Sequence, residues 1–197
     1  ELKECYDGYH FTHNSIGMYN PFSLLNAFKY KEFGSYWFET GTPTYLVSLL
    51  KKHHYDLERM AHEETDAQVL NSIDSESTNP IPVIYQSGYL TIKGYDEEFG
   101  IYRLGFPNRE VEEGFVRFML PYYANVNKVE SPFEIQKFVC EVRSGDYDSF
   151  FRRLQSFFAD TTYEVIRDQE LHYENVLFIV FKPVSYTHLT LPTILLV

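Results

Sequence analysis

The sequence predicts a mainly helical α+β protein with one β-hairpin, in which a winged-helix-like module precedes a helical segment. Residues 89–93 and 101–106 alternate in hydropathy like two strands, and the polar, acidic residues 94–100 form the turn between them. The segments on either side show the three-to-four-residue apolar spacing of helices. Two helices followed by a hairpin is the order expected of a winged helix, with the hairpin as its wing.

The N-terminal part is expected to contain a turn and two helices. Residues 6–9 include an Asp-Gly pair, which is a turn signal because glycine accepts positive φ. Asn20 is held extended before Pro21, and proline suits the first turn of a helix. Thr42 followed by Pro43 provides an N-cap and a first helical residue for the next helix.

The stretch from residue 55 to residue 79 is polar and acidic. We expect a solvated, variable connection here, which could contain one short helix. Pro80 and Pro82 then open a short helix that leads into the hairpin.

Helices are also expected after the hairpin. Asn108 caps the first of them, which should end at a break over residues 121–128. The next should begin at residues 131–134, where Ser-Pro-Phe-Glu has the spacing of a capping box. Gly145 should end that helix.

Two more helices complete the expected order. Asp146 should cap a helix whose apolar face is formed by Phe150, Phe151, Leu154, Phe157 and Phe158. On that helix, Arg152 and Arg153 are expected on the solvated face. Residues 161–166 are expected to be extended, and a last helix should start at Asp168 and run over 170–182. Its later part is apolar nearly all round, which is typical of a helix inside a larger domain.

Composition limits the function classes. The formal net charge is −11, which argues against a surface that is a nucleic-acid footprint as a whole, although a local basic patch stays possible. Cys5 and Cys140 are the two cysteines, too few for a disulfide framework, and they indicate a reducing compartment. No apolar run approaches the length of a membrane span. We therefore expect a cytoplasmic protein with no membrane partner.

The residues show no complete catalytic constellation. The histidines form two loose groups without the cysteines or spaced carboxylates of a metal site. No glycine-rich phosphate loop and no nucleophile elbow are present. The cysteines are expected to be buried and inert, although a Cys/His pair is possible. We expect no catalytic residue, cofactor or metal in this chain.

The turn at 94–100 bears on the partner of the winged-helix-like module. Such modules bind DNA through a helix and the wing, but Asp96, Glu97 and Glu98 would repel phosphate. A protein partner is favoured over DNA, and direct nucleic-acid binding is not expected.

Five sequence blocks resemble the C-terminal part of the AAA-ATPase-like domain that bacterial proteins, often of Bacteroidales type, carry fused to a PD-(D/E)XK nuclease-like domain. The blocks are Tyr6-Asp7-Gly8-Tyr9, Tyr19-Asn20-Pro21-Phe22-Ser23, Tyr36-Trp37 with Thr40-Gly41, Ser87-Gly88-Tyr89-Leu90-Thr91-Ile92, and Pro107-Asn108 with Glu110-Val111. The family-motif residues among them are Tyr6, Asp7, Gly8, Tyr9, Asn20, Pro21, Ser23, Trp37, Gly41, Gly88, Tyr89, Pro107, Asn108 and Glu110.

The resemblance implies two domains. Residues 1–111 would be the lid and winged-helix-like part of the ATPase-like domain, and residues 112–182 the leading helices of the nuclease-like domain. ATP and Mg²⁺ would be bound by the parent protein, with Walker segments upstream of Glu1 and the nuclease Asp and Glu-x-Lys downstream of Lys182. Glu170 matches the position of an acidic residue in many such folds, and the simpler explanation is a charge that favours the helix dipole.

The end of the chain departs from the pattern before it. Residues 184–193 resemble one reading frame of a translated sequencing adapter, so residues 183–197 are expected to be a non-native tail. The alternative is an ordinary C-terminal edge strand after a proline. The overall expectation is a fragment, inactive by itself, of an ATP-binding, nucleic-acid-processing protein whose partner is the rest of that parent. The alternative is a winged-helix-type protein–protein interaction module without catalysis.

Overall fold

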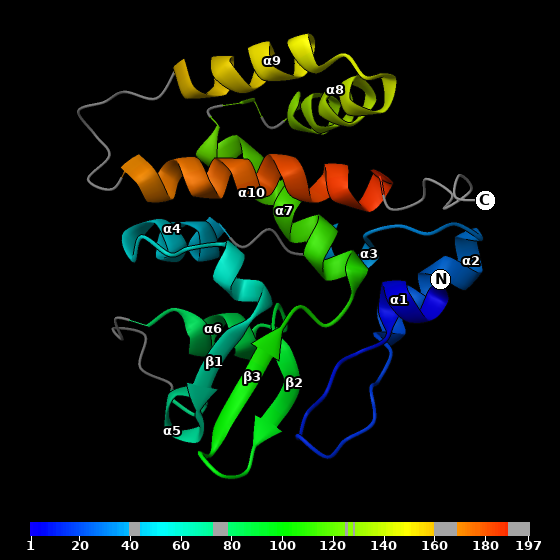
Figure 1. The fold of residues 1–197 in the computed structure, drawn as a ribbon. Coiled ribbons are helices and arrows are strands. Elements are labelled where there is room, and N and C mark those ends of the chain that lie inside the picture. Colours follow the sequence, from blue (N-terminus) through cyan, green and yellow to red (C-terminus); the bar gives the residue numbers. More distant parts are fainter. Residues whose placement is uncertain (40–43, 73–78, 125, 128, 160–168, 189–197) are drawn as a thin grey trace, which may run out of the picture. The chain divides into compact units, whose positions relative to one another are not determined.

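The structure is a computed structural model that describes residues 1–39, 44–72, 79–124, 126–127, 129–159 and 169–188 (Figure 1). It is mainly helical with a small antiparallel sheet, which confirms the α+β class. The chain divides into two compact units, Glu1–Phe115 and Val116–Val197, and each is described by itself.

The first unit carries the sheet. Its elements are α1 (Leu2–Tyr6), α2 (Pro21–Tyr30), α3 (Tyr36–Glu39), α4 (Thr44–Lys52), the 3₁₀ helix η1 (Glu58–Ala61), β1 (Glu63–Asp66), α5 (Ala67–Leu70), α6 (Ile81–Gln86), β2 (Thr91–Asp96), β3 (Ile101–Gly105) and the start of α7 (Arg109–Tyr123). The predicted hairpin is present as β2 and β3, which pair antiparallel with Tyr95 opposite Tyr102. The most deeply buried side chains of this unit include Tyr6, Leu57, Met60, Ile84, Leu90, Leu104 and Phe115.

The sheet has a third strand where the sequence predicts a solvated connection. β1 pairs antiparallel with β3, so the strand order is β1-β3-β2. Alternate residues of β1 are buried, and these are the polar Glu63 and Thr65. The Glu63 carboxylate accepts hydrogen bonds from the Tyr55 hydroxyl and from Arg59. Strand alternation is hidden in the sequence because the buried positions are polar and are satisfied by these partners.

The predicted helix starts of the first unit are mostly correct. The Asn20 side chain accepts hydrogen bonds from the backbone N–H groups of Phe22 and Ser23, at 3.0 and 3.2 Å, and so caps α2. Asn108 caps α7 by accepting from the Val111 N–H at 3.2 Å. The predicted cap at residues 42–43 lies outside the described residues, and α4 is described from Thr44.

The break predicted over residues 121–128 is wrong at its start. α7 runs through Pro121 to Tyr123. A proline inside a helix removes one backbone hydrogen bond. Leu120 and Tyr123 lie on either side of Pro121 and are both buried, and this burial offsets the lost bond.

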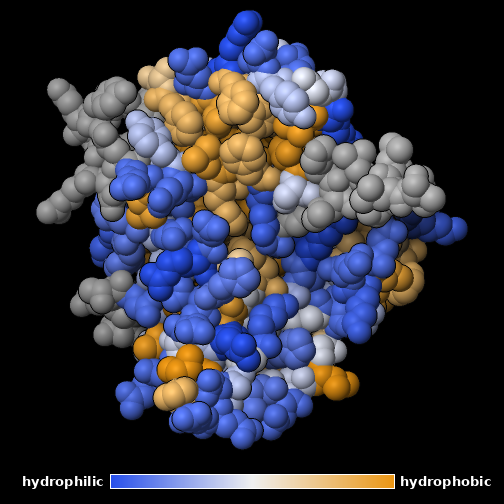
Figure 2. All heavy atoms as spheres, viewed as in Figure 1, coloured by the Kyte–Doolittle hydropathy of each residue, from blue (hydrophilic) through white to orange (hydrophobic). Residues whose placement is uncertain are grey.

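The second unit is a set of helices: the rest of α7, α8 (Ser131–Ser144), α9 (Tyr147–Ala159) and α10 (Gln169–His188). The Phe138 ring of α8 packs edge-on against Phe150 and Phe157 of α9, with centroids 5.3 and 5.2 Å apart. Buried Val176 and Ile179 come from α10, which packs on α8. Figure 2 shows apolar side chains gathered over these helices on the viewed face. Gly145 ends α8 with φ of +75°, and Asp146 caps α9 by accepting from the Ser149 N–H.

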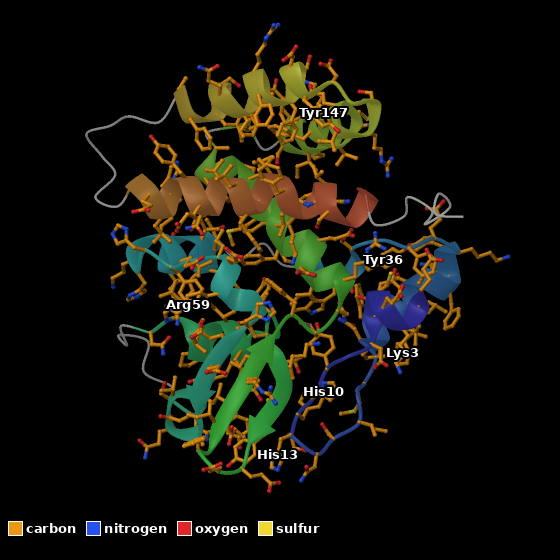
Figure 3. The ribbon with its side chains drawn as sticks, in the orientation of Figure 1. Lys3, His10, His13, Tyr36, Arg59 and Tyr147 are labelled. Atoms are coloured by element: carbon orange, nitrogen blue, oxygen red, sulfur yellow. The ribbon has the colours of Figure 1, made fainter. Side chains whose placement is uncertain are left out.

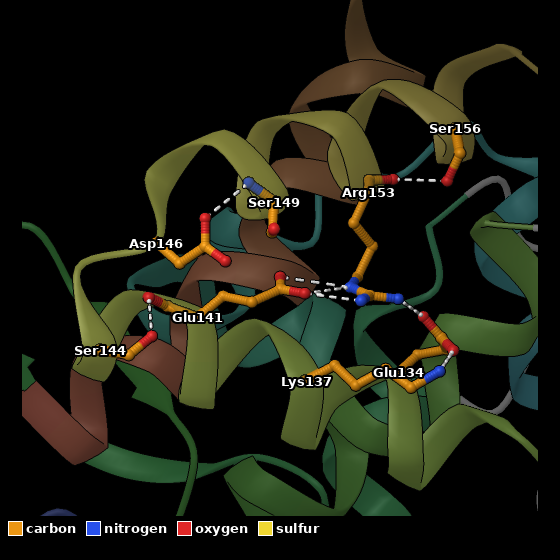
Figure 4. Close-up of polar contacts among 8 residues, drawn as sticks. All are labelled: Glu134, Lys137, Glu141, Ser144, Asp146, Ser149, Arg153 and Ser156. Carbon is orange, nitrogen blue, oxygen red and sulfur yellow. Dashed lines mark hydrogen bonds and ion pairs between the residues drawn. The ribbon is translucent and has the colours of Figure 1, made fainter.

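The predicted capping box at residues 131–134 and the predicted solvated position of Arg153 are both wrong, because Arg153 bonds to side chains of α8 (Figure 4). Its guanidinium donates to both Glu134 and Glu141 of α8, at 2.8 and 2.6 Å. Glu134 is therefore not the partner in a capping box, and Glu130, not Ser131, precedes the first turn without a side-chain cap. Arg153 offers Glu134 a donor that carries a full positive charge, and Arg–carboxylate bonds are among the strong hydrogen bonds of proteins, which explains the different partner.

The same ion pairs set the charge state of Glu134. Burial by itself raises the pKa of this carboxyl, but hydrogen bonds from Lys137 and Arg153 outweigh burial and leave the pKa below its usual range.

The prediction that Phe151 lies on the apolar face of α9 is also wrong. Phe151 is 60% exposed, while Phe150 and Phe157 are buried.

α10 does not end at Lys182. It continues through Pro183 to His188, so the proline breaker and the alternative edge strand are wrong over this range. Val180 and Val184, one turn apart, are both buried, and their packing holds the helix across the proline. The non-native tail stays a prediction, and residues 161–166, Asp168 and 189–197 lie outside the described residues.

Candidate binding pocket

The family-motif blocks of the first unit meet at Glu110, in the first turn of α7. One oxygen of its buried carboxylate accepts a hydrogen bond from the Ser23 hydroxyl at 2.9 Å and another from the Trp37 backbone N–H at 2.8 Å. Ser23 belongs to α2 and Trp37 to α3. Glu110 therefore fastens two N-terminal helices to the start of α7.

A second junction lies where the chain leaves α1. Gly8 has φ of +111°, and a Cβ atom there would lie 2.2 Å from the Pro107 carbonyl oxygen. Only glycine fits this position. The same carbonyl accepts a hydrogen bond from Lys93 at 2.9 Å. Asp7 accepts from the Gly8 N–H and so supports the turn.

A third junction is aromatic. The Tyr89 ring lies edge-on to Trp37 and to Phe38, with centroids 5.3 and 5.8 Å apart. Gly88, at φ of +82°, places its backbone close to Trp37 and Tyr9, which would lie 3.5 and 3.8 Å from a Cβ atom there. Burial raises the pKa of the Tyr89 phenol to about 12.

The N-terminal loop, residues 7–19, lies beside β2 (Figure 3). Its ends are joined by backbone hydrogen bonds between Tyr9 and Met18, at 3.1 and 2.9 Å. The Thr91 hydroxyl accepts from the His10 N–H at 2.7 Å and donates to the His10 carbonyl at 3.0 Å. The His13 ring lies 4.6 Å from the Tyr95 ring. This loop covers the outer edge of β2 through side-chain contacts.

These junctions enclose a cavity of about 600 Å³, which lies entirely within the first unit. Its walls come from the N-terminal loop, the start of α2, α3, and the turn between α6 and β2. The lining residues are Tyr9, His10, Phe11, Met18, Tyr19, Asn20, Pro21, Trp37, Tyr85, Gln86, Ser87, Gly88, Leu90 and Thr91. Eight of the fourteen are Tyr, Trp, Phe, Met, Pro or Leu, and none is Asp, Glu, Lys or Arg.

Two buried polar atoms belong to the pocket residues. Burial raises the pKa of the Tyr9 phenol, and nearby Asn20 lowers it by less. His10 Nδ1 is buried and has no hydrogen-bond partner among the residues that the structure describes. Neutral imidazole nitrogens can accept or donate a hydrogen bond. The Tyr9 hydroxyl is likewise buried without a hydrogen-bond partner among the described residues, so Tyr9 and His10 both offer a polar atom that a ligand could satisfy.

The sequence-predicted site residues fall into three groups. Gly8, Gly88 and Tyr89 shape the pocket or its support, and Tyr9, Asn20, Pro21 and Trp37 line it. Tyr6, Asp7, Ser23, Pro107, Asn108 and Glu110 form the hydrogen-bonded framework around it. Gly41 lies outside the described residues.

Glu170, Cys5 and Cys140 are not among the lining residues of this pocket. Glu170 is exposed in the first turn of α10, where an acidic side chain favours the helix dipole. Cys140 is exposed, so the expectation of a buried thiol is wrong there. Cys5 is half-buried, and burial raises the pKa of its thiol, which keeps it protonated. Within the described residues, no group of three or more His, Cys, Asp or Glu side chains could hold a metal ion.

Sequence reasoning missed the pocket itself and the lining residues outside the five blocks, among them Phe11, Tyr85 and Gln86. Tyr85 and Gln86 are the last two residues of α6, and Phe11 lies in a loop. None of the three stands in a turn, cap or motif pattern, so no signal in the sequence pointed to them.

No helix in the described parts of the chain combines the length and the apolar character needed to cross a membrane.

The comparisons with known proteins give one relative. No family model matches the chain, and no solved structure matches it. A protein of Azotobacter chroococcum mcd 1 named "Uncharacterized protein in vnfD 5'region" is 36% identical over 126 residues, which cover 62% of this chain and 24% of that protein. The chain thus spans about a quarter of the length of the curated relative it matches.

Proposed function

We propose that residues 1–115 form a non-catalytic, winged-helix-type module that binds protein, within a longer cytoplasmic protein that resembles a P-loop ATPase joined to a nuclease-like domain. The helices from α8 to α10 would then be the leading helices of the nuclease-like part. ATP and Mg²⁺ would be bound by other segments of that parent. The relative that extends well beyond the matched region is consistent with a longer parent.

The observation that carries the winged-helix proposal is the order of elements in the first unit. α4, η1, β1, α5, α6, β2 and β3 follow one another, and the sheet order is β1-β3-β2. This order supports a winged-helix interpretation, because helices that lead into a β-hairpin are what such a module needs. In this arrangement α6 would be the recognition helix and the turn between β2 and β3 the wing tip.

The side chains of these two elements favour protein over DNA as the partner. α6 has the sequence Ile-Pro-Val-Ile-Tyr-Gln, which contains no cation, and Ile81 and Ile84 are buried. The wing tip carries Glu97 and Glu98, and Phe99 beside them is 70% exposed. DNA affinity depends on cations that replace counterions along the phosphates. The exposed ring of Phe99 suits a protein surface instead, because aromatic side chains are enriched at protein interfaces.

We propose that this chain has no activity by itself because its polar motif residues make structural hydrogen bonds. Asn20 and Asn108 cap helices, and Glu110 holds α2 and α3 in place. These side chains already bond to the chain itself, so their described partners give them structural roles.

The experiment for this proposal measures ATP hydrolysis and Mg²⁺-dependent nicking of plasmid DNA by the purified chain. We expect neither activity above a buffer blank. Activity that stays with the chain through purification, and that is lost in the variant Gly8→Val because its fold is disrupted, would contradict the proposal. The coding DNA on either side provides a second test, since a Walker A segment upstream and a Glu-x-Lys segment downstream are expected.

A further inference from the structure

We propose that the pocket binds an extended peptide segment that is anchored by proline or aromatic side chains and flanked by Lys or Arg. This proposal rests on the protein-binding function proposed above and names the chemistry of the partner. It is carried by the walls of the pocket, by the apolar side chains that continue from it, and by the charge of the wing tip.

The walls select an uncharged, ring-containing ligand. Trp37, Tyr85 and Phe11 provide aromatic surface, and Pro21 and Gly88 allow close approach. Aromatic-lined grooves are the usual docking site for proline-rich segments, because the extended proline helix loses little entropy on binding. No lysine or arginine lines the pocket to neutralise an anion, which disfavours nucleotides and single-stranded nucleic acid.

The surface beside the pocket favours a chain over a compact molecule. Pro21, in the pocket wall, is followed along α2 by Phe22 and Leu25, which are 46% and 67% exposed. Phe11, which also lines the pocket, is 68% exposed. A small molecule held in the cavity would leave these apolar side chains in water. A peptide that passes through the pocket would cover them, which is favourable in proportion to the apolar area removed from water.

Polar groups at the pocket can bond to a peptide backbone. The side chains of Gln86 and Ser87 are exposed where α6 ends before β2. The Gln86 amide NH₂ donates to the Leu70 and Ser72 carbonyls, so its own carbonyl oxygen is the group that can accept from a ligand, and the Ser87 hydroxyl can donate or accept. His10 Nδ1 is buried and has no hydrogen-bond partner among the described residues. These groups are few and well separated, as expected for a site that fixes the direction of an otherwise apolar ligand.

The acidic wing tip indicates that the peptide also carries positive charge. β2 runs from Thr91 in the pocket to Asp96 at the tip, five residue steps, or about 17 Å at the rise of a strand. An extended peptide covers that span with about five or six residues. Lys or Arg at that distance from the anchor would meet Glu97 and Glu98. The net charge of −11 also favours a basic partner.

The experiment uses the single tryptophan of the chain, Trp37, as a reporter of pocket occupancy. A random peptide library is selected on the full chain, and one enriched peptide is synthesised and titrated against it. We expect enriched peptides to share proline or aromatic anchors with Lys or Arg about five residues away, and to shift the emission of Trp37.

Three variants test the location of binding. Ser87→Phe adds bulk at the exposed mouth of the pocket and should weaken peptide binding about tenfold or more, as loss of an anchor contact does. Ser156→Phe is the matched control, the same change at an exposed serine of α9, and should leave binding unchanged. The double variant Glu97→Lys/Glu98→Lys should weaken binding several-fold and reduce its dependence on salt.

Several results would overturn the proposal. These are a selection without enriched peptides, binding that Ser87→Phe leaves unchanged, or a Trp37 response to indole or ATP but to no selected peptide. The last would indicate a small-molecule site. These failures are separate from a failure of the proposed function, which would appear as ATP hydrolysis, DNA cleavage or duplex binding by the same chain.

Discussion

Replacement of Glu110 by alanine tests whether the family-motif residues act as a structural framework. Its carboxylate is 5% exposed and accepts hydrogen bonds from the Ser23 hydroxyl and the Trp37 backbone N–H. Glu110→Ala removes the shared acceptor and leaves the two donors without it. A buried donor without a partner costs about 1–3 kcal/mol. We therefore expect the free energy of unfolding of the first unit to fall by about 3 kcal/mol, since the Ser23 hydroxyl can rotate in search of another acceptor.

Two companion variants separate the hydrogen bonds from other effects. Glu110→Gln keeps an acceptor oxygen in the same place and should cost about 1 kcal/mol. Glu113→Ala, on the same helix, loses a partly exposed i,i+4 ion pair with Arg109 and should cost about 0.5 kcal/mol. The order of destabilisation should be Glu110→Ala, then Glu110→Gln, then Glu113→Ala.

The assay is urea unfolding followed by the fluorescence of Trp37, which lies in the first unit and next to the altered bond. The change in unfolding free energy is read from the midpoint and slope. The reasoning fails if Glu110→Ala and Glu113→Ala have equal effects, or if Glu110→Gln is as destabilising as Glu110→Ala. The first result would mean that the buried acceptor contributes nothing, and the second that charge alone matters.

Three further predictions concern backbone, charge and burial. Gly8→Ala should destabilise the first unit by more than about 2 kcal/mol, whereas Gly145→Ala, at φ of +75° with no atom within 4 Å, should cost only about 1 kcal/mol, both measured by urea unfolding. Arg153→Met should cost about 1–2 kcal/mol at neutral pH by circular dichroism, and the cost should shrink in acid. The reason is that hydrogen bonds from Lys137 and Arg153 outweigh burial and hold the pKa of Glu134 below its ordinary value of 4.5. The contribution of Glu134 to stability is therefore present above pH 4.5 and is lost as the pH falls through the folded pKa. Burial raises the pKa of Tyr89 to about 12, so its contribution to stability is present below pH 10 and is lost as the pH rises toward 12. Burial also raises the pKa of Tyr9, Tyr55 and Tyr123, so Tyr89→Phe should reduce the alkaline loss of stability without removing it, and an unchanged pH profile would contradict this prediction.

The helices and the hairpin were predictable because their signals are local. Asn20, Asn108, Gly145 and Asp146 mark helix ends through their own side chains or backbone, and each does so in the structure. The alternating residues of the hairpin likewise form β2 and β3. These are short-range effects that a single sequence contains.

The errors arise where tertiary partners override local preference. Glu63 is buried in a strand because Tyr55 and Arg59 satisfy it. Glu134 accepts a hydrogen bond from Arg153 of another helix and does not cap its own helix. Pro121 remains inside a helix because its neighbours are buried. None of these partners can be identified from spacing along the chain.

The candidate site was half predictable. The resemblance identified Tyr9, Trp37 and Gly88 as motif residues, and these residues do lie together. Tyr85 and Ser87 complete the pocket only because α6 ends beside the N-terminal loop, which depends on the fold. The pocket as a site therefore required the structure.

The central claim, that the winged-helix-type module binds protein and not DNA, is tested most directly by fluorescence anisotropy of a labelled DNA duplex titrated with the full chain at two salt concentrations. We expect no saturable binding near physiological salt and no steep change on lowering the salt, because α6 has no cation and the wing tip is acidic. Tight binding that weakens by about a thousandfold between about 50 and 200 mM salt would indicate several phosphate contacts and would contradict the claim.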